Sequence, residues 1–374
     1  MQSLSKRHFI QGISAGILST ALQNLQAKTT GPHVLGLTLP LTGPQAEVAS
    51  ELLVGYQTAV YGSQGTLLLR VLDDESNPEK TVANIRILAS DKQVIAVSGI
   101  VGTPHAKAAL PEALKLNLPV VGIRSGASSL RMGQEGVYHL RASFEQELNK
   151  VAQLCSGGGV KRVAFIYSND SFGIASRDYL SERLNGLGLD SSIRYAVERN
   201  GSNTEQVVEA IATAIKKAQI PTAVALLMIT KPMQEALVLL RSKHKIIMPV
   251  YAMSFSATRG VATSKDSAFN GLGLVSAFPI PRSASSRLLL VYREQLIAAG
   301  HVDYMESITT FEGYFYGSVV AQAARSARTR SDLTRQLESG MDLHDTKIVF
   351  NSEKVGYQHL EVIHKGSGET KFRS

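Results

Sequence analysis

Short apolar runs alternate with longer stretches of helical pattern along most of the chain after residue 33. Most of the apolar runs are continuous rather than alternating in polarity, which is typical of strands that are covered on both faces. Repeated alternation of strands and helices predicts an α/β fold, with parallel sheets and helices on both sides. The predicted strands cover residues 33–41, 66–74, 94–101, 118–125, 162–170, 191–198, 223–230, 246–254 and 271–279.

The predicted helices lie between and after these runs, and one of them has a clear start signal. Asn77 can cap it, Pro78 fits its first turn, and Glu79 faces its dipole favourably. Pro111 falls inside another helix and is expected to kink or split it, because proline lacks the N–H group that a helix interior uses. The predicted helices cover residues 46–62, 79–91, 104–116, 144–155, 173–186, 203–218, 232–243, 284–299 and 306–328.

The alternation falls into two series, which predicts two α/β units. Four predicted strands precede residue 126, and a second series starts at residue 162. Residues 345–366 differ from both series and are expected to form two strands joined by a polar turn. No repeat of 20–50 residues occurs in the chain, which excludes a solenoid.

The first 27 residues have the pattern of a signal peptide. A basic pair, Lys6 and Arg7, precedes a modest apolar run that ends at Leu25-Gln26-Ala27, a suitable cleavage site. The basic pair also resembles a twin-arginine export motif with lysine in the first position. An amphipathic helix is the alternative for this segment. Because no later segment has the length of a membrane span, we expect a soluble, exported mature protein.

Charge and cysteine content narrow the classes of partner. The net charge is +8, or +6 without the first 27 residues, and the basic residues are scattered rather than grouped. A nucleic-acid partner is therefore not expected. The single cysteine, Cys155, can form no intrachain disulfide or cysteine zinc site, and we expect it to be buried in a helix.

The sequence contains no motif of nucleotide, metal or nucleophile chemistry. The phosphate-loop, GxGxxG and HExxH patterns are missing, and no histidines fall at metal-ligand spacing. GxSxG occurs only at residues 12–16, within the predicted signal peptide, and no such elbow follows a predicted strand. The acidic pair Asp73–Asp74 ends a predicted strand, where a capped turn is favoured over a catalytic dyad. These observations favour a binding protein without a cofactor or a metal over an enzyme.

Small and hydroxyl-bearing residues follow several predicted strands. In open α/β sheets, ligands bind beyond the carboxyl ends of the strands, and small residues let a ligand approach the backbone there. Thr103 follows the strand at 94–101, where it can cap the next helix or hold an anion at the helix start. Residues close to it in sequence do not decide between the two. The other strand ends of this kind are residues 39–44, 124–129 and 168–173.

Three segments carry a resemblance to a known family. They are LGLTLPLTGPQAEVASELLVGYQTAV, the stretch from LLLRVLDDESNPEK to VVGIRSGASSLR, and RVAFIYSNDSFG. They resemble the leucine/isoleucine/valine-binding type of periplasmic solute-binding protein, the exported receptors of ABC importers. The resemblance covers nearly all of residues 33–366.

This resemblance implies two Rossmann-like lobes with a cleft between them, joined by three crossovers near residues 142–144, 270–275 and 344–348. The implied division gives residues 1–27 to the signal peptide, 28–143 and 273–346 to the first lobe, and 144–272 and 347–374 to the second. It also implies that Thr103 and the segment Gly126-Ala127-Ser128 hold a ligand carboxylate. Phe172 matches an aromatic residue of the family. The positions implied to line the cleft from the second lobe are Phe172, Thr230 and Ser254.

The chain departs from the family pattern at the position that binds the ammonium group of an amino-acid ligand. Members that bind amino acids have an acid where this chain reads Tyr251-Ala252-Met253-Ser254-Phe255. A buried ammonium without an acid partner is costly. The ligand is therefore expected to be a simple carboxylate, keto acid, aromatic acid or amide, unless Glu47 or Asp170 supplies the acid. Arg124 and Lys231 either face the cleft and favour an anion or point into solvent.

Three functions remain open at this stage. The first is a monomeric periplasmic receptor that closes around its ligand by a hinge motion and delivers it to an inner-membrane ABC permease. The second is a protein of the same fold that reports the ligand to a signalling protein. The third is an exported hydrolase or transferase that uses Asp74, Asp170 or His105.

Overall fold

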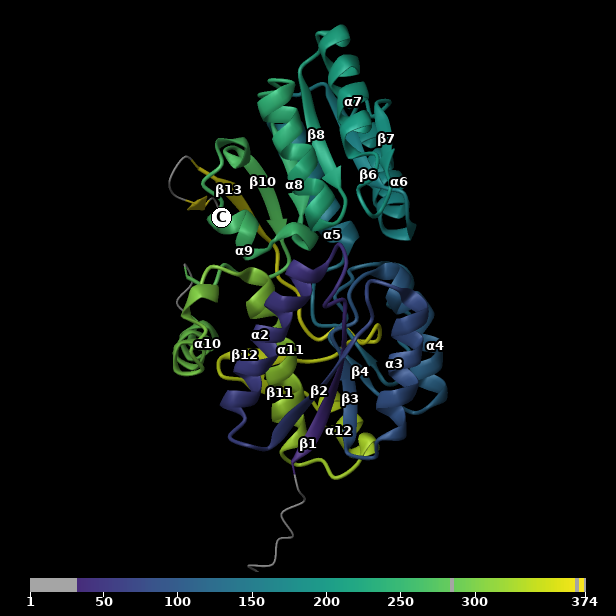
Figure 1. Ribbon diagram of the computed structural model, residues 1–374, viewed down its shortest axis with the longest axis vertical. Helices are drawn as coiled ribbons and strands as arrows, with labels where there is room; N and C mark the ends of the chain where they lie inside the picture. The colour runs from purple at the N-terminus through teal and green to yellow at the C-terminus, as the bar shows by residue number, and fades with distance from the viewer. Residues whose placement is uncertain (1–31, 283–285, 367–369, 373–374) are drawn as a thin grey trace, which may run out of the picture. The chain divides into compact units, whose positions relative to one another are not determined.

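The computed structural model describes residues 32–282, 286–366 and 370–372 (Figure 1). The predicted signal peptide, residues 1–27, lies outside this described part. None of the helices within it is both long and apolar enough to cross a membrane. The described strands form one five-stranded sheet, one seven-stranded sheet and a two-stranded ribbon.

The five-stranded sheet is parallel throughout, with strand order β2-β1-β3-β4-β5. All residues of β3 and nearly all of β1 are buried, as expected for strands covered on both faces. Its strands are β1 (His33–Leu39), β2 (Leu67–Asp73), β3 (Val94–Ser98), β4 (Val120–Val121) and β5 (Val137–Tyr138).

Helices cover both faces of this sheet, with α3 and α4 on one side and α2 and α11 on the other (Figure 1). Two glycines let α2 and α11 touch through their backbones. A Cβ on Gly55 would lie 2.1 Å from Thr310 O, and one on Gly313 would lie 2.3 Å from Leu52 O. The helices of this half are α2 (Ala46–Gly62), α3 (Pro78–Ser90), α4 (Thr103–Lys115), α10 (Arg287–Ala298), η5 (Val302–Tyr304), α11 (Ile308–Ala324) and α12 (Arg330–Glu338).

The seven-stranded sheet has the order β14-β13-β10-β9-β8-β6-β7. Its five parallel strands, β7-β6-β8-β9-β10, repeat the order of the first sheet, and β13 and β14 add antiparallel strands at one edge. These strands are β6 (Arg162–Ser168), β7 (Arg194–Val197), β8 (Thr222–Leu227), β9 (Val250–Met253), β10 (Leu272–Ser276), β13 (Glu361–Lys365) and β14 (Thr370–Phe372).

The helices around this second sheet include α5 and α6, which pack together, and α7 and α8, which do the same. The structure confirms the predicted α/β class and the two series of elements. These helices are α5 (Phe144–Gly157), α6 (Ser171–Gly186), α7 (Thr204–Ala218), α8 (Thr230–Val238) with its π-helical extension η2 (Leu239–Lys243), η3 (Ser254–Ser256), α9 (Arg259–Thr263) and η4 (Ser267–Phe269).

The strand predicted at 118–125 is much shorter in the structure. Strand β4 ends at Val121, because Gly122 has a φ of +74° and lies against a buried ring. A Cβ on Gly122 would be 2.4 Å from Tyr316 Cγ. After this interruption, Arg124 forms one isolated parallel β-bridge with Val101. The prediction also missed β5, which has only two residues.

The start of α4 decides one of the two alternatives for Thr103. Gly102, with a φ of +100°, occupies the N-cap position, and Thr103 is the first helical residue, so the Thr103 hydroxyl does not cap the helix. Pro111 does not split the helix, which continues to Lys115. Pro111 lies on the exposed side, where water can bond the carbonyl group that proline leaves without a partner.

The two strands expected in the tail do not pair with each other. β12 (Thr346–Ile348) pairs with β11 (Met341–Leu343) as a ribbon, whereas β13 joins the second sheet beside β10. The polar segment between them is therefore a connection from one half to the other. The implied lobe boundary at 272/273 falls inside β10, and the boundary at 346/347 falls inside β12; boundaries after Ser276 and Ile348 keep both strands whole.

Candidate functional site

The residues predicted to line the site all follow the carboxyl ends of parallel strands. Thr103 follows β3, Gly126 follows β4, Phe172 follows β6, Thr230 follows β8 and Ser254 follows β9. In both sheets the chain order reverses at the first strand, between β1 and β3 and between β6 and β8. Such switch points are where open α/β sheets bind ligands, so both sheets place these residues where a ligand site is expected.

Thr103 joins the start of α4 to the loop after β4. Its Oγ1 lies 2.9 Å from Ser125 Oγ, and both side chains are buried. Ser125 Oγ also accepts a hydrogen bond from Ala127 N at 3.3 Å. The pair of hydroxyls therefore couples the two segments that the sequence singled out.

The loop Gly126-Ala127-Ser128 is divided between interior and surface. A Cβ on Gly126 would lie 2.7 Å from both the ring and the backbone nitrogen of Phe144, so only glycine fits. Ala127 is buried beside it, whereas Ser128 is exposed and starts the short helix η1 (Ser128–Leu130). The structure thus places Gly126 and Ala127 inside and leaves the Ser128 side chain at the surface.

Three phenylalanine rings meet next to this loop. The ring centroids of Phe144 and Phe172 are 4.8 Å apart, and those of Phe172 and Phe255 are 5.2 Å apart and nearly parallel. All three side chains are buried. Phe144, Phe172 and Phe255, from α5, α6 and η3, form what we call the phenylalanine cluster, and Gly126 of the first half packs against it.

Thr230 and Ser254 have hydroxyls that are already engaged within the protein. Thr230 Oγ1 donates to Phe255 O at 3.1 Å. Ser254 donates to Glu147 through both its backbone N, at 2.9 Å, and its Oγ, at 2.8 Å. Both residues therefore hold the backbone around Phe255 in place.

Arg124 crosses from the first half to the second. Its side chain is fully buried, its Nε lies 3.0 Å from Glu312 Oε2, and its guanidinium donates to Phe255 O at 3.3 Å. The guanidinium carbon also lies 4.8 Å from the centroid of the Phe255 ring. Of the two cations left open by the sequence, Arg124 points inward and Lys231 is exposed.

A second buried arginine completes a charge network behind Ser254. Arg141 contacts Glu312 Oε1 at 3.0 Å and Glu147 Oε1 at 3.3 Å, and it donates to Ser254 Oγ. Burial opposes the charge on Arg141, but attraction by Glu312 and Glu147 raises its pKa above the ordinary value. The network pairs two buried cations with two buried carboxylates and so carries no net charge.

Another polar group lies beside the start of α4. Asp170 caps α6 by accepting from the backbone N atoms of Phe172 and Gly173, both at 2.9 Å, and it pairs with Arg199. Arg199 Nε and Nη2 are buried and have no hydrogen-bond partner among the described residues. A Cβ on Gly102 would lie 3.1 Å from Arg199 Nη2, so this guanidinium faces the first turn of α4.

Two more polar side chains are buried at the same strand ends. Burial, and then the charge of Arg199, lower the pKa of His105 to about 4, so its ring is neutral at pH 7. Gln45, which precedes α2, is almost completely buried, and its amide nitrogen and oxygen have no partner in the described part of the chain. Buried groups of this kind are suited to a polar ligand.

The acidic pair Asp73–Asp74 forms a turn, as the sequence favoured. Asp73 accepts from the backbone N of Leu41 at 2.9 Å and of Glu75 at 2.8 Å, and Asp74 accepts from Ser76 N at 3.0 Å. Burial raises the pKa of Asp74 to about 6. Both carboxylates therefore close the loops after β1 and β2.

Sequence reasoning missed Arg141, Glu147, Glu312, Gln45 and Arg199. Glu312 had the best signal, because it is an isolated acid in the apolar helical run from Ile308 to Ala324. Within the described ranges, no group of three or more His, Cys, Asp or Glu side chains is arranged to hold a metal ion.

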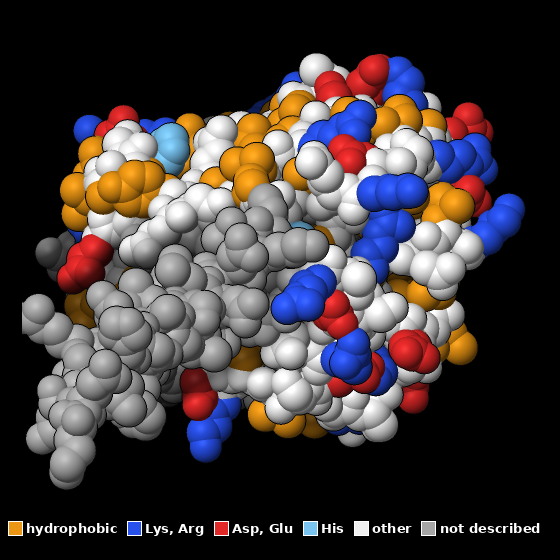
Figure 2. All heavy atoms as spheres, turned by 90° about the horizontal axis from the view of Figure 1, so that it is seen from below, with side chains coloured by type: hydrophobic (Ala, Val, Ile, Leu, Met, Phe, Trp, Pro, Cys, Tyr) orange, Lys and Arg blue, Asp and Glu red, His pale blue; other side chains and the backbone are white. Residues whose placement is uncertain are grey.

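The surface that Figure 2 shows mixes basic with acidic side chains. Exposed ion pairs elsewhere on the protein include Arg86 with Glu112 at 2.8 Å and Lys354 with Glu338 at 2.6 Å. This mixture agrees with the scattered charge of the sequence.

Two α/β sheets whose five parallel strands share one order, with polar and aromatic residues gathered at the carboxyl ends, have the layout in which open α/β folds bind ligands. A family model described as periplasmic binding protein matches residues 32–353. The chain belongs to this family, in its leucine/isoleucine/valine-binding group. The family implies a location outside the cytoplasm.

Solved structures show the same fold. A protein from Rhodopirellula baltica, described as a possible leucine/isoleucine/valine-binding protein, has 23% identity and a TM-score of 0.82, covering 92% of this chain and 96% of that one. A substrate-binding periplasmic protein from Ralstonia solanacearum has 22% identity and a TM-score of 0.82, with 91% and 100% covered. No curated protein sequence matches the chain.

A more distant structure carries a bound amino acid. It is an ABC transporter substrate-binding protein from Desulfitobacterium hafniense in complex with Leu, with 16% identity and a TM-score of 0.70. The alignment covers 91% of this chain and all of that one. At such identities the likeness establishes the fold, and the ligand of this chain has to be argued from its own residues.

Proposed function

We propose that the protein is an exported receptor of an ABC importer and that it binds a small carboxylate between its two halves. Membership of the periplasmic binding protein family supports the receptor role. The N-terminal signal pattern supports export. An inner-membrane permease is the partner that such a receptor serves.

The observation that carries the carboxylate is the pair of unpartnered Arg199 nitrogens beside Gly102. A guanidinium with two free donors binds a carboxylate through charge-assisted hydrogen bonds. The first turn of α4 adds the positive end of a helix dipole. The hydroxyls of Thr103 and Ser125 lie at the same helix start and supply neutral donors.

The other proposed residues have supporting roles. Gly126 lets the loop pack directly against Phe144, Ala127 is buried beside it, and the Ser128 side chain is exposed at the end of the loop. Phe172 offers an apolar face. Thr230 and Ser254 fix the Phe255 segment through the hydrogen bonds described above.

Binding proceeds by hinge closure, the motion that periplasmic binding proteins use around their ligands. Contacts from both halves are complete only in the closed state, so the ligand shifts the population toward it. The hinge consists of described segments that connect the sheets, at residues 139–143, 277–282 and 349–360, with lobes on either side of it. Small-angle scattering with and without ligand measures this closure, and an unchanged radius of gyration at saturation contradicts it.

The test begins with mass spectrometry of small molecules released from the purified protein, followed by calorimetry with the acid found. Thr103→Val and Ser125→Ala are each expected to weaken binding by about 1–3 kcal/mol, the cost of losing a buried donor. Thr58→Val is the matched control, because the Thr58 hydroxyl bonds only to Val54 O within α2.

Unchanged affinity in both site variants would remove this site from the proposal. Release of a neutral sugar or a peptide would overturn the carboxylate assignment. Turnover of the released compound by the purified protein would replace the receptor role with an enzymatic one.

A further inference from the structure

The carboxylates buried around the proposed site are already committed to partners. Glu312 accepts from Arg124, Arg141 and the Tyr316 hydroxyl, the last at 2.7 Å. Glu147 accepts from Ser254 and Arg141. A ligand ammonium would have to break one of these contacts to find a counter-charge.

Two further acids on this side, Asp170 and Glu51, are committed as well. Asp170 holds the first turn of α6 and pairs with Arg199. Glu51, on α2, accepts from Arg259 N at 2.9 Å and from Ser307 Oγ. Glu47 has no hydrogen-bond partner for its carboxylate among the described residues, and its Oε1 lies against Gly260 of α9. Glu145, which follows Phe144 in the first turn of α5, also has a buried Oε2 without a hydrogen-bond partner among the described residues. Glu47 and Glu145 are therefore the two acids that the test has to exclude.

Three buried groups without hydrogen-bond partners among the described residues can donate to a ligand anion. Arg199 and the ring of His105 lie at the start of α4, and the amide of Gln45 lies at the start of α2. Gln45 and His105 are each about 99% buried. A buried polar group without a partner is costly, so a ligand that satisfies it gains affinity.

The phenylalanine cluster supplies the apolar half of the site. All three of its rings come from the half that contains the second sheet, and Phe144 packs against Gly126 of the first half. Phe144 N also donates to Gly126 O at 2.8 Å, so the backbone ties this ring to the first half. A planar ligand ring is therefore placed against Phe172 and Phe255, because offset and edge-to-face contacts between aromatic rings are favourable.

The cluster and the donors are directly linked. Phe172 and Asp170 belong to the same helix start, and Asp170 holds Arg199. Resting on the function proposed above, we propose that the ligand is an aromatic carboxylate without an ammonium group. Arg199, which keeps its pair with Asp170, donates to it through its two unpartnered nitrogens, and the phenylalanine cluster lies against its ring. Arg199 and Phe172 are then the residues that set specificity.

Calorimetry with four acids tests this assignment: 3-phenylpropionate, benzoate, L-phenylalanine and butyrate. L-Phenylalanine and 3-phenylpropionate share a skeleton and differ in the ammonium group, whereas butyrate lacks the ring. We expect an aromatic acid without ammonium to bind at least about 100-fold more tightly than either L-phenylalanine or butyrate. Tighter binding of L-phenylalanine or butyrate overturns the inference, as does the absence of binding by all four.

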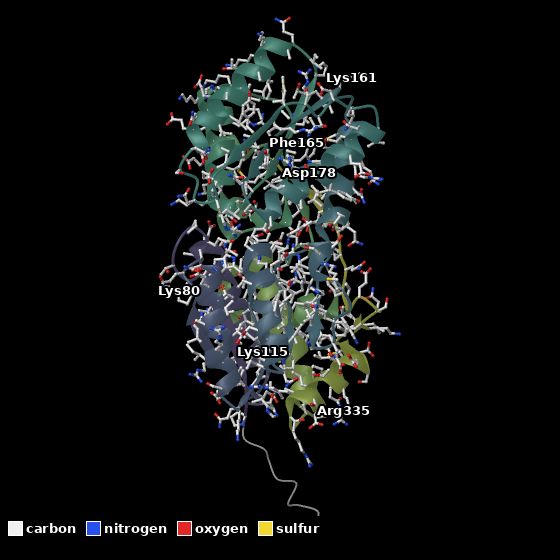
Figure 3. The ribbon with its side chains drawn as sticks, turned by 90° about the vertical axis from the view of Figure 1, so that its right-hand side faces the viewer. Lys80, Lys115, Lys161, Phe165, Asp178 and Arg335 are labelled. Carbon is white, nitrogen blue, oxygen red and sulfur yellow. The ribbon has the colours of Figure 1, made fainter. Side chains whose placement is uncertain are left out.

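Variants connect the affinity to the named residues. Arg199→Gln is expected to weaken binding of the aromatic acid at least about 30-fold. The affinity of Arg199→Lys is expected to lie between those of the wild type and Arg199→Gln, because lysine keeps the positive charge but lacks the several N–H donors of the guanidinium. Phe172→Leu is expected to weaken it about 10-fold. Phe165→Leu is the matched control. Phe165 is buried on β6 (Figure 3), and the ring contacts of the phenylalanine cluster do not include it.

The outcomes separate this inference from the function on which it rests. If L-phenylalanine binds best and Glu47→Gln or Glu145→Gln abolishes its binding, the inference fails and the carboxylate receptor stands. If aromatic acids bind but Arg199→Gln and Phe172→Leu change nothing while Thr103→Val weakens binding, these two residues lose their role, and the inference fails with them. If the protein releases only a neutral compound and binds no acid, both fail.

Discussion

Glu312 is the single carboxylate that neutralises Arg124 and also contacts Arg141. Its side chain is buried to 2% exposure, and its oxygens accept from Arg124 Nε and Arg141 Nη1, both at 3.0 Å, and from the Tyr316 hydroxyl. Glu312→Gln keeps the shape of the side chain but removes the charge. One of the two guanidinium groups then faces an amide NH₂ group, which is also a donor.

The magnitude follows from the burial of the two arginines. Both are fully buried, and in the variant only Glu147 remains to balance them. Breaking a buried ion pair by removing one partner costs about 3–5 kcal/mol, because the remaining charge stays desolvated. At about 2 °C per kcal/mol for a chain of this size, Glu312→Gln is expected to lower Tm by about 6–10 °C.

Differential scanning calorimetry at pH 7 measures this shift. Glu112→Gln is the control, because the ion pair of Glu112 with Arg86 lies at the surface and its loss is expected to leave Tm unchanged. A loss of less than about 1 kcal/mol in Glu312→Gln, comparable to an ordinary surface substitution, would refute the view that this carboxylate neutralises the buried arginines.

Three further predictions concern pH, a helix cap and the cysteine. Burial raises the pKa of Glu51 from 4.5 to about 7, so the folded state binds the proton more tightly than the unfolded state does, and this carboxyl destabilises the fold by about 3 kcal/mol as pH rises from 4.5 to 7. In Glu51→Gln, the free energy of unfolding, measured by urea unfolding at several pH values, should fall less between pH 4.5 and 7 than it does in the wild type. Asn77→Ala should cost about 1 kcal/mol in the same assay, because Asn77 accepts from Glu79 N and Lys80 N. Burial raises the pKa of the Cys155 thiol to about 12, so a thiol reagent should label it only in urea.

Each of these has an outcome that contradicts it. Parallel pH profiles for the wild type and Glu51→Gln would show that Glu51 does not titrate in this range. An Asn77→Ala variant as stable as the wild type would mean that water caps α3 equally well. Rapid labelling of Cys155 in native buffer would show that α5 opens readily around it.

Local signals were sufficient for most elements of the fold. Continuous apolar runs gave β1, β3 and β8, and the Asn77-Pro78-Glu79 pattern gave the start of α3. These signals succeed because strand burial and helix capping depend on residues that are near each other in the chain. The pattern failed at β4, where the φ of Gly122 and the ring of Tyr316 decide the backbone.

The candidate site was only partly visible in the sequence. The resemblance pointed to Thr103, Gly126 and Phe172, and the structure places Gly126 and Phe172 around the same ring of Phe144. Arg199 gave no signal, because its loop after β7 lies far in sequence from Gly102, which it faces. Proximity of this kind arises only when the two halves are assembled.

The sequence by itself determined the α/β class, the positions of most strands and helices, and the small, hydroxyl-bearing ends of the strands. Tertiary structure decided that β12 pairs with β11 and β13 with β10, and that Arg124, Arg141, Glu147 and Glu312 are buried together. The physical reason is the distance along the chain over which each interaction acts. Helical and strand periodicity is set within a few residues. Strand partners and the burial of charges depend on groups that folding brings together from distant parts of the chain.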